Sequence, residues 1–260
     1  MNFIASNQAL GQFGFFIIAV IVIAIIVGLA EAVACVLNII VFAKTRKINK
    51  TESECQLDGM QVARNLLDNM GINDVQVVKA GFFRVLFYGD YYDPKKKTIY
   101  LRKSVIEGKS VRTIASTVLN VAYAEGDKNG DKTYARSAKI RPFMMFAPYI
   151  FIPLVLVGLV LDVLIAQAIG TITAICSIVG FAYYLWAIIY FCTTIPQLKK
   201  AMARSSEIIK QTNLLSENEQ IMVDELYKYT VMAEIANMIL AIIYMLKYLV
   251  KILGYFTRRK

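Results

Sequence analysis

The sequence contains no histidine among its 260 residues. This absence excludes a Ser-His-Asp triad, a Cys-His dyad, an HExxH zinc motif and an imidazole pH switch from the chain. Charged residues are also scarce, at 18%, whereas hydrophobic residues make up 57% and the mean hydropathy is +0.53. A water-soluble protein of this length rarely carries so large an apolar fraction, so the composition predicts membrane-spanning segments.

The four cysteines form neither a redox motif nor a metal motif. No two of them make a CxxC pair, and without histidine they cannot complete a mixed zinc-ligand set. Three lie in or beside apolar stretches, whereas Cys55 lies in a polar one. We interpret them as three small buried hydrophobic residues and one surface thiol.

Charged side chains are confined to parts of the chain. Glu31 is the only charge in residues 1–43, and Asp162 is the only one between Pro142 and Leu198. Four apolar stretches are long enough to cross a bilayer, which needs about 20 residues. They are Phe13–Ala43, Phe143–Leu161, Ile169–Ile195 and Thr230–Leu253. The sequence predicts a mostly α-helical, membrane-embedded protein with about four transmembrane helices.

The distribution of Lys and Arg predicts the orientation of these helices. Basic residues follow the first stretch, at Lys44, and the third, at Lys199, and others precede the second. Because basic flanks favour the cytoplasmic side, we expect an external N-terminus and a polar segment in the cytoplasm beneath the cell membrane. A fourth crossing would leave basic residues 258–260 outside, so the last helix either spans the membrane or lies in its interface.

The polar segment has the pattern of a small α+β domain. A helix is predicted over Leu57–Met70, with Gly71 as its stop, and Ser110 is placed to cap a second helix that reaches about Glu125. The apolar positions of this second helix have helical spacing; they are Val111, Ile114, Ala115, Val118, Leu119 and Ala122. Strands are predicted over Val75–Val78, Phe82–Tyr88 and Thr98–Leu101, with a turn at Tyr92–Pro94 and the three lysines that follow.

These elements, in this order, resemble the YugP-like family of membrane-bound neutral zinc metallopeptidases. The resemblance rests on seven segments and reaches from about Leu57 to Leu253. The segments are Gly59–Asp68 with Asp74–Val77, Asp90–Pro94 with Thr98–Leu101, Ser110–Ala124, Thr194–Pro196 and Leu214–Glu217. The resemblance implies a zincin-like domain and an HExxH helix that binds zinc.

The positions that the resemblance assigns to the metal site have lost their chemistry. When the motif is aligned from Ser110, Leu119 and Tyr123 stand at the two histidine positions of HExxH, and Asn120 stands at the glutamate position. The further carboxylate ligand of the family falls at Leu198. None of these side chains is a good zinc ligand at neutral pH. The stretch Asp127–Lys132 starts like a calcium loop, but Lys132 stands where that loop needs glycine, so we interpret it as a solvated turn. We expect no catalytic residue, no zinc and no other cofactor.

The leading hypothesis is a catalytically inactive scaffold or interaction subunit of a membrane complex. Its partners would be membrane lipids and other membrane proteins, without nucleic acid, because the basic flanks lack a nucleic-acid motif. Two alternatives remain: a zinc metallopeptidase with non-standard or partner-supplied ligands, and a small transporter or channel subunit. Candidate interaction residues are Glu31, Asn120, Tyr123, Glu234 and Lys247, of which three are charges in or beside apolar stretches.

The expected organisation has five segments. They are an N-terminal transmembrane anchor (1–43), a cytoplasmic zincin-like domain without the metal site (44–142), a transmembrane hairpin (143–195), a cytoplasmic helical segment (196–229), and a C-terminal transmembrane or interfacial helix with a basic tail (230–260).

Overall fold

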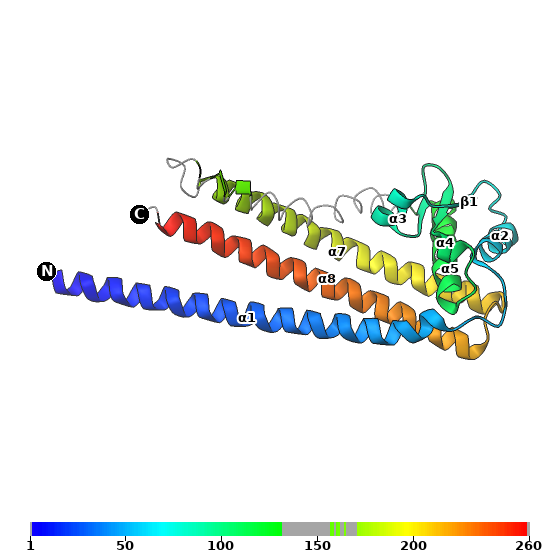
Figure 1. Cartoon of the computed structure of the whole chain (residues 1–260), viewed down its shortest axis with the longest axis horizontal. Coiled ribbons are helices and arrows are strands. Elements are labelled where there is room, and N and C mark those ends of the chain that lie inside the picture. The colour runs from blue at the N-terminus through cyan, green and yellow to red at the C-terminus, as the bar shows by residue number, and fades with distance from the viewer. Residues whose placement is uncertain (1, 132–156, 159, 162–163, 165–170, 259–260) are drawn as a thin grey trace.

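The protein is an elongated molecule in which three long helices lie side by side and a small domain, here called the head, sits at one end (Figure 1). The computed structural model describes residues 2–131, 157–158, 160–161, 164 and 171–258. The long helices are α1 (Asn2–Lys50), α7 (Thr171–Gln211) and α8 (Glu217–Arg258). Helix α8 contacts both α1 and α7, and the two chain ends lie at the end of the molecule away from the head (Figure 1).

All three long helices are long and apolar enough to cross a membrane. Three of the four predicted spans fall on them: Phe13–Ala43 on α1, Ile169–Ile195 on α7 and Thr230–Leu253 on α8. The predicted span Phe143–Leu161 lies almost wholly outside the described residues. The chain is therefore a mostly helical membrane protein with three candidate spanning helices among its described residues, and the fourth span stays a prediction.

The long helices are continuous across the expected segment boundaries. Helix α1 runs past residue 43 to Lys50, and α7 runs through Pro196 without a break. Helix α8 likewise contains both residue 229 and residue 230. Each helix thus passes from its apolar part into the head as one rigid element. Cys35 and Cys192 lie on the exposed apolar surface of these helices, so the prediction that both are buried is wrong.

The head contains a three-stranded sheet covered by helices. Its strands are β1 (Gln76–Lys79), β2 (Tyr91–Asp93) and β3 (Thr98–Leu101), in the order β1-β3-β2. Strand β1 pairs parallel to β3, with Val77 opposite Ile99, and β2 pairs antiparallel to β3, with Tyr92 opposite Ile99. The head helices are α2 (Gly59–Asn69), α3 (Phe82–Tyr88), α4 (Lys103–Ile106) and α5 (Val111–Lys128).

The ends of α2 and α5 follow from local sequence. Asp58 and Gln61 form a capping box at the start of α2, in which the backbone N–H of Gln61 donates to Asp58 Oδ1 at 2.8 Å. Gly71, at φ +62°, follows that helix in the left-handed region, as the sequence predicted. Ser110 caps α5 by accepting a hydrogen bond from the Thr113 amide at 3.2 Å. Both predicted helices are confirmed, and α5 extends to Lys128.

The prediction of a strand over Phe82–Tyr88 is wrong, because this segment forms helix α3. The aromatic and branched side chains favour a strand by propensity, but propensity in strands depends strongly on packing. In the helix, Val85 and Tyr88 share one face and pack against a cluster of Ala80, Tyr91 and Tyr100. The Gly89 amide closes the last turn on the Val85 carbonyl, at a φ of +65° that glycine adopts without strain.

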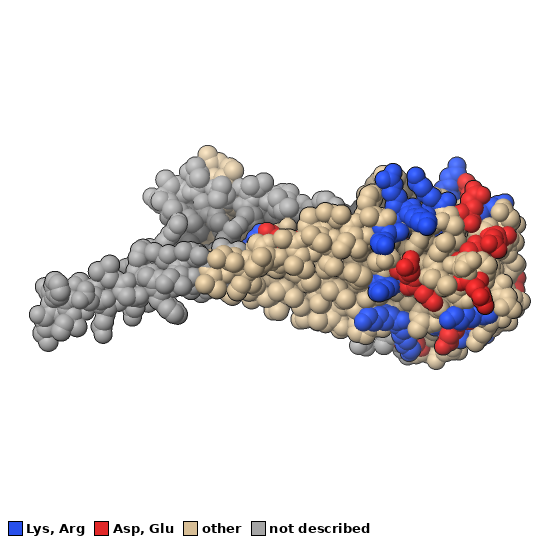
Figure 2. Space-filling model, turned by 90° about the horizontal axis from the view of Figure 1, so that it is seen from below, with Lys and Arg blue, Asp and Glu red and all other residues tan. Residues whose placement is uncertain are grey.

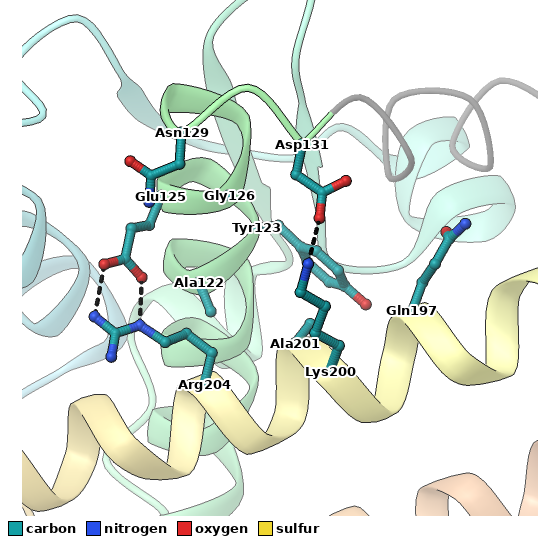
Figure 3. A pocket seen from close by; sticks show the side chains of 10 residues that line it. All are labelled: Ala122, Tyr123, Glu125, Gly126, Asn129, Asp131, Gln197, Lys200, Ala201 and Arg204. Carbon is teal, nitrogen blue, oxygen red and sulfur yellow. Dashed lines mark hydrogen bonds and ion pairs between the residues drawn. The ribbon is translucent and has the colours of Figure 1, made fainter.

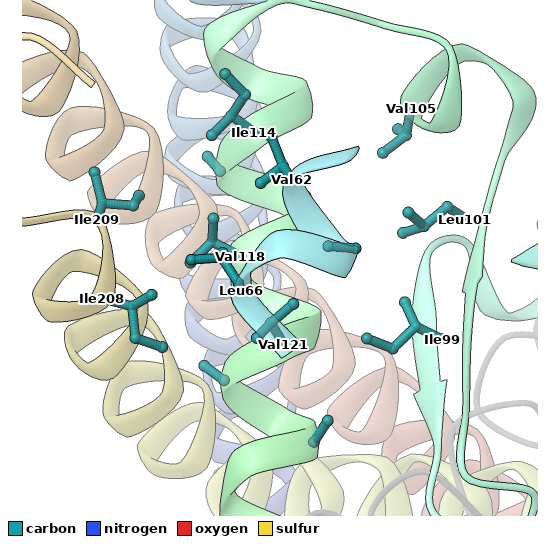
Figure 4. Close-up of a cluster of buried hydrophobic side chains, with 14 of the residues drawn as sticks. Val62, Leu66, Ile99, Leu101, Val105, Ile114, Val118, Val121, Ile208 and Ile209 are labelled. Atoms are coloured by element: carbon teal, nitrogen blue, oxygen red, sulfur yellow. The ribbon is translucent and has the colours of Figure 1, made fainter. Parts of the chain in front are cut away.

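The hydrophobic core of the head is built around α5 (Figure 4). Ile114, Val118 and Val121 of this helix are completely buried. They pack among apolar side chains of α2, the sheet and the head end of α7, where Ile208 and Ile209 are also fully buried. Helix α5 therefore joins the soluble part of the fold to the helix that carries the chain into the membrane.

The C-terminal end of α5 is fixed to the sheet by Asp127. Its Oδ2 accepts a hydrogen bond from the Tyr92 hydroxyl and another from Lys97 Nζ, both at 2.8 Å. Burial, together with the bond to Asp127, raises the pKa of Tyr92, so the phenol remains a hydrogen-bond donor. Asp127, the first residue of the calcium-loop-like stretch, thus lies in the last turn of α5 and makes a structural contact with the sheet.

Candidate functional site

A pocket of about 300 Å³ lies between α5 and α7, where the head meets the long helices (Figure 3). One wall comes from the last turns of α5 and the loop after it, and the other from the head half of α7. The lining residues are Ala122, Tyr123, Glu125, Gly126, Asn129, Asp131, Gln197, Lys200, Ala201 and Arg204. The two walls are far apart in sequence, so only the folded chain creates the pocket.

Two ion pairs connect the walls of this pocket (Figure 3). The Arg204 guanidinium donates to both carboxylate oxygens of Glu125, at 2.7 and 2.8 Å, and a third bond of 2.9 Å reaches Glu207. Lys200 Nζ donates to Asp131 Oδ2 at 3.0 Å. A bidentate Arg–carboxylate pair fixes both distance and orientation, so Arg204 and Glu125 set the spacing of α5 and α7.

Gln197 places an amide at the end of the pocket nearest the apolar part of α7. Within the described part of the chain, its Oε1 is buried without a hydrogen-bond partner. Tyr123 lies on the opposite wall (Figure 3). The pocket therefore combines paired charges toward its head end with a neutral polar side chain toward the membrane end, a mixture suited to a polar peptide segment or side chain.

The predicted metal-site positions do not converge on this pocket. Tyr123 lines it, but Asn120 is 3% exposed and belongs to the core-facing side of α5. The Asn120 Nδ2 donates to the Ser116 carbonyl at 2.9 Å, one turn back along its own helix. Leu119 and Leu198 are partly buried and pack against the hydrophobic core. Asn120 and Tyr123 therefore face different surroundings, the first the core and the second the pocket.

These side chains do not fit a zinc ion. Leu119 and Leu198 offer no donor atom, and the Asn120 amide faces a helix carbonyl as a hydrogen-bond donor. The carboxylates that line the pocket, Glu125 and Asp131, are held by Arg204 and Lys200. Zinc sites need several nitrogen, sulfur or carboxylate ligands directed at one point, and this arrangement of alkyl, amide and paired carboxylate groups does not provide them.

The structure brings together two other candidates that the sequence left apart. Glu31 of α1 and Lys247 of α8 form an ion pair, although 216 positions separate them. Lys247 Nζ also lies 5.3 Å from the centre of the Tyr244 ring. Glu234 is half-buried elsewhere on α8. Two of the charges within the apolar stretches thus connect the long helices α1 and α8.

The residues that shape the pocket were missed because their partners are distant in sequence. Glu125 and Arg204 are 79 positions apart, and nothing in either local pattern identifies the other. Lys200 and Arg204 are one helical turn apart, in the basic flank that follows the third apolar stretch. That spacing places both side chains on one face of a helix, and from it the sequence could have predicted that they line the same surface.

Comparisons with known proteins agree with the order of elements in the chain. The family model described as "Putative neutral zinc metallopeptidase" matches residues 17–253. A relative from Bacillus subtilis (strain 168), named "Putative membrane protease YugP", is 23% identical over 204 residues, which cover 78% of this chain and 84% of the relative. No solved structure matches the chain. Because the family model covers most of its length, the chain belongs to the neutral zinc metallopeptidase family.

Proposed function

We propose that the protein is a catalytically inactive member of this family that serves as a scaffold or interaction subunit of a membrane complex. The observation that carries the proposal is the complete absence of histidine from a chain that matches the family over residues 17–253. The side chains at the expected metal positions support it, because Leu119, Asn120 and Leu198 pack in or against the core. A fold retained without its ligands is most simply explained by a binding role.

The α5–α7 pocket is the proposed binding site. Its Lys200 side chain is 78% exposed beside Asp131, so a partner can reach a cation there without disrupting the buried core. Tyr123 supplies an aromatic wall, and aromatic and basic side chains dominate the energetics of many protein interfaces. A polar or acidic segment of another membrane protein fits this lining.

The purified protein is expected to contain no stoichiometric zinc. The reason is the donor set, since neither alkyl side chains nor an amide engaged with a helix carbonyl replaces the ligands of a zinc site. Elemental analysis of the detergent-solubilised protein, after exposure to zinc and removal of the free ion, checks this. About one tightly bound zinc per chain would contradict the proposal, because a catalytic site of this family keeps its metal through several protein ligands.

Charge reversal in the pocket is expected to release the partner. In Lys200→Glu the cation is replaced by a carboxylate beside Asp131, so recovery of co-purifying membrane proteins should fall about tenfold, equivalent to about 1.4 kcal/mol. Lys199→Glu is the matched control, because this neighbouring lysine is exposed but does not line the pocket. Equal recovery with both variants, at equal abundance, would place the partner elsewhere on the molecule.

The head is proposed to lie on the cytoplasmic side of the cell membrane. Lys44 and Lys199, where α1 and α7 enter the head, are exposed basic residues, and such flanks favour the cytoplasm. Figure 2 supports this orientation, since Lys and Arg side chains gather where the apolar helices meet the head.

Thiol labelling checks the orientation. With Cys55 kept and the other cysteines replaced, a membrane-impermeant maleimide is expected to label intact cells weakly and permeabilised cells strongly. Lys96→Cys, in the exposed turn between β2 and β3, provides a second site on the head. Ser6→Cys, near the N-terminus, is the control expected to react from outside. Labelling of both head sites in intact cells would reverse the orientation.

A further inference from the structure

Helix α3 presents an apolar face on the surface of the head. Phe82, Phe83 and Leu86 are 76%, 71% and 55% exposed, although the head has a well-formed core elsewhere. They fall on one side of the helix, because Leu86 is four positions after Phe82 and three after Phe83, and residues three and four apart are neighbours on a helical surface. Three large apolar side chains on one short helix are a concentrated patch, and such patches mark contact with a protein or a membrane.

The other face of α3 is firmly attached to the head, so the apolar side chains are held in place. Tyr88 stacks on Tyr91, with ring centres 4.7 Å apart, and Tyr91 stacks on Tyr100 at 5.1 Å. The Arg84 guanidinium lies 4.1 Å from the centre of the Tyr100 ring. These contacts hold one face of α3 on the sheet and leave Phe82 and Leu86 exposed.

The position of α3 along the molecule suggests what covers this face. Figure 1 shows α3 at the edge of the head that faces the apolar parts of the long helices, whereas α2 lies at the opposite edge. The membrane that holds α1, α7 and α8 must therefore end near this edge. An amphipathic helix at that level meets the headgroup layer of the bilayer.

The charges around α3 suit an anionic lipid surface. An open hollow of about 570 Å³ beside the helix is lined by Phe82 and Val85 and by the charged residues Arg102, Lys103 and Glu107, among others. Arg102 pairs with the buried side chain of Asp90, and the 68% exposed Lys103 side chain lies 3.9 Å from Glu107, so both cations have carboxylate neighbours but Lys103 is still open to a headgroup. Basic residues close to a bilayer are attracted to anionic headgroups, while their neighbouring aromatic side chains enter the interface.

We propose that α3 is a membrane-interfacial helix: it inserts Phe82, Phe83 and Leu86 into the headgroup layer of the same bilayer that the long helices span. This second contact fixes the tilt of the head against the membrane. It keeps the α5–α7 pocket at a constant height above the lipid, because α3, the sheet and α5 belong to one packed domain. A partner that reaches the pocket must then approach along the membrane surface.

Site-directed spin labelling tests this proposal. The full chain, with its native cysteines replaced, is reconstituted into vesicles of equal parts phosphatidylcholine and phosphatidylglycerol. Nitroxides at Phe82→Cys and Leu86→Cys are expected to collide with oxygen more than with a water-soluble nickel chelate, giving a depth of about 5–10 Å below the headgroups. The matched control is Ile221→Cys, because Ile221 is 62% exposed near the start of α8, at the far end of the head, and should show the aqueous pattern (Figure 1).

A label at position 82 that is as accessible to the nickel chelate as the label at 221 overturns the proposal. The vesicles contain no other protein, so a face that binds a protein partner gives this same aqueous result.

A second variant keeps an aromatic ring: Phe82→Trp with the single native tryptophan removed by Trp186→Phe. Its fluorescence is expected to be quenched by lipids brominated high in the acyl chain and protected from aqueous iodide. Quenching by iodide alone also overturns the proposal.

Discussion

Replacing Val118 by aspartate is expected to unfold the head. Val118 is completely buried in the middle of α5, among apolar side chains of α2, the sheet and α7. A carboxylate there has no cationic partner, and burying an unpaired charge is among the most costly single substitutions, with losses of about 4 kcal/mol or more. Since a domain is typically stabilised by about 5–15 kcal/mol in total, the variant should lose most of its cooperative folding.

Limited proteolysis of membranes that contain the Val118→Asp variant measures this effect. The head should be digested while the lipid-embedded parts of the long helices survive, and the abundance of the full-length chain should fall. Asn65→Asp is the control, because it introduces the same charge on an exposed position of α2 and should alter stability by only about 0.5 kcal/mol. A protease-resistant head in Val118→Asp would mean that α5 does not form the centre of the core.

The helices of the head that pack on a continuous apolar face could be predicted from the sequence. In α5, Val111, Ile114 and Val118 recur with the helical period, and all three are fully buried. Strands β1 and β3 were predicted within one residue of their ends. Periodicity and capping are local properties of the chain, so these elements required no knowledge of the tertiary fold.

Helix α3 and strand β2 show where local patterns fail. The run Phe82–Tyr88 has strand-forming residues, but Val85 and Tyr88 find their apolar contacts only when the segment is helical. Strand β2 is short, and two of its residues, Tyr92 and Asp93, were assigned to the turn that follows it, because they become a strand only by pairing with β3. In both cases the decisive contacts come from residues that are not adjacent in sequence.

The candidate site divides in the same way. Tyr123 lines the pocket and Asn120 faces the core, a difference that the family resemblance does not give because it assigns positions in the sequence and not directions in space. The pairing of Arg204 with Glu125 depends on how α7 crosses α5, which no local pattern specifies. The contacts of the site therefore follow from the tertiary fold and not from local sequence.

The Glu31–Lys247 pair is expected to stabilise the bundle of long helices from inside the membrane. Lys44 is the first basic residue after the apolar part of α1. Glu31 lies about 20 Å before it along the helix axis, at a rise of about 1.5 Å per residue. A hydrocarbon core is about 30 Å thick, so the pair lies within it. The side chains of Glu31 and Lys247 are 38% and 40% exposed, and at this depth that exposure is to lipid, which does not screen charge as water does.

Removing one member of this pair should cost far more than removing both. Glu31→Gln leaves the Lys247 cation unpaired in lipid, at a cost of about 2.5–3.5 kcal/mol, and Lys247→Met leaves the carboxylate in the same position. The double variant Glu31→Gln with Lys247→Met carries no uncompensated charge, so it should recover most of the stability lost by either change.

Cys35→Ser, one turn further along α1 on its exposed surface, is the control and should have little effect. A double-mutant cycle on the thermal denaturation of the solubilised protein measures the coupling. Purely additive effects of the two substitutions would show that Glu31 and Lys247 do not stabilise each other, and that α1 is held against α8 by apolar packing alone.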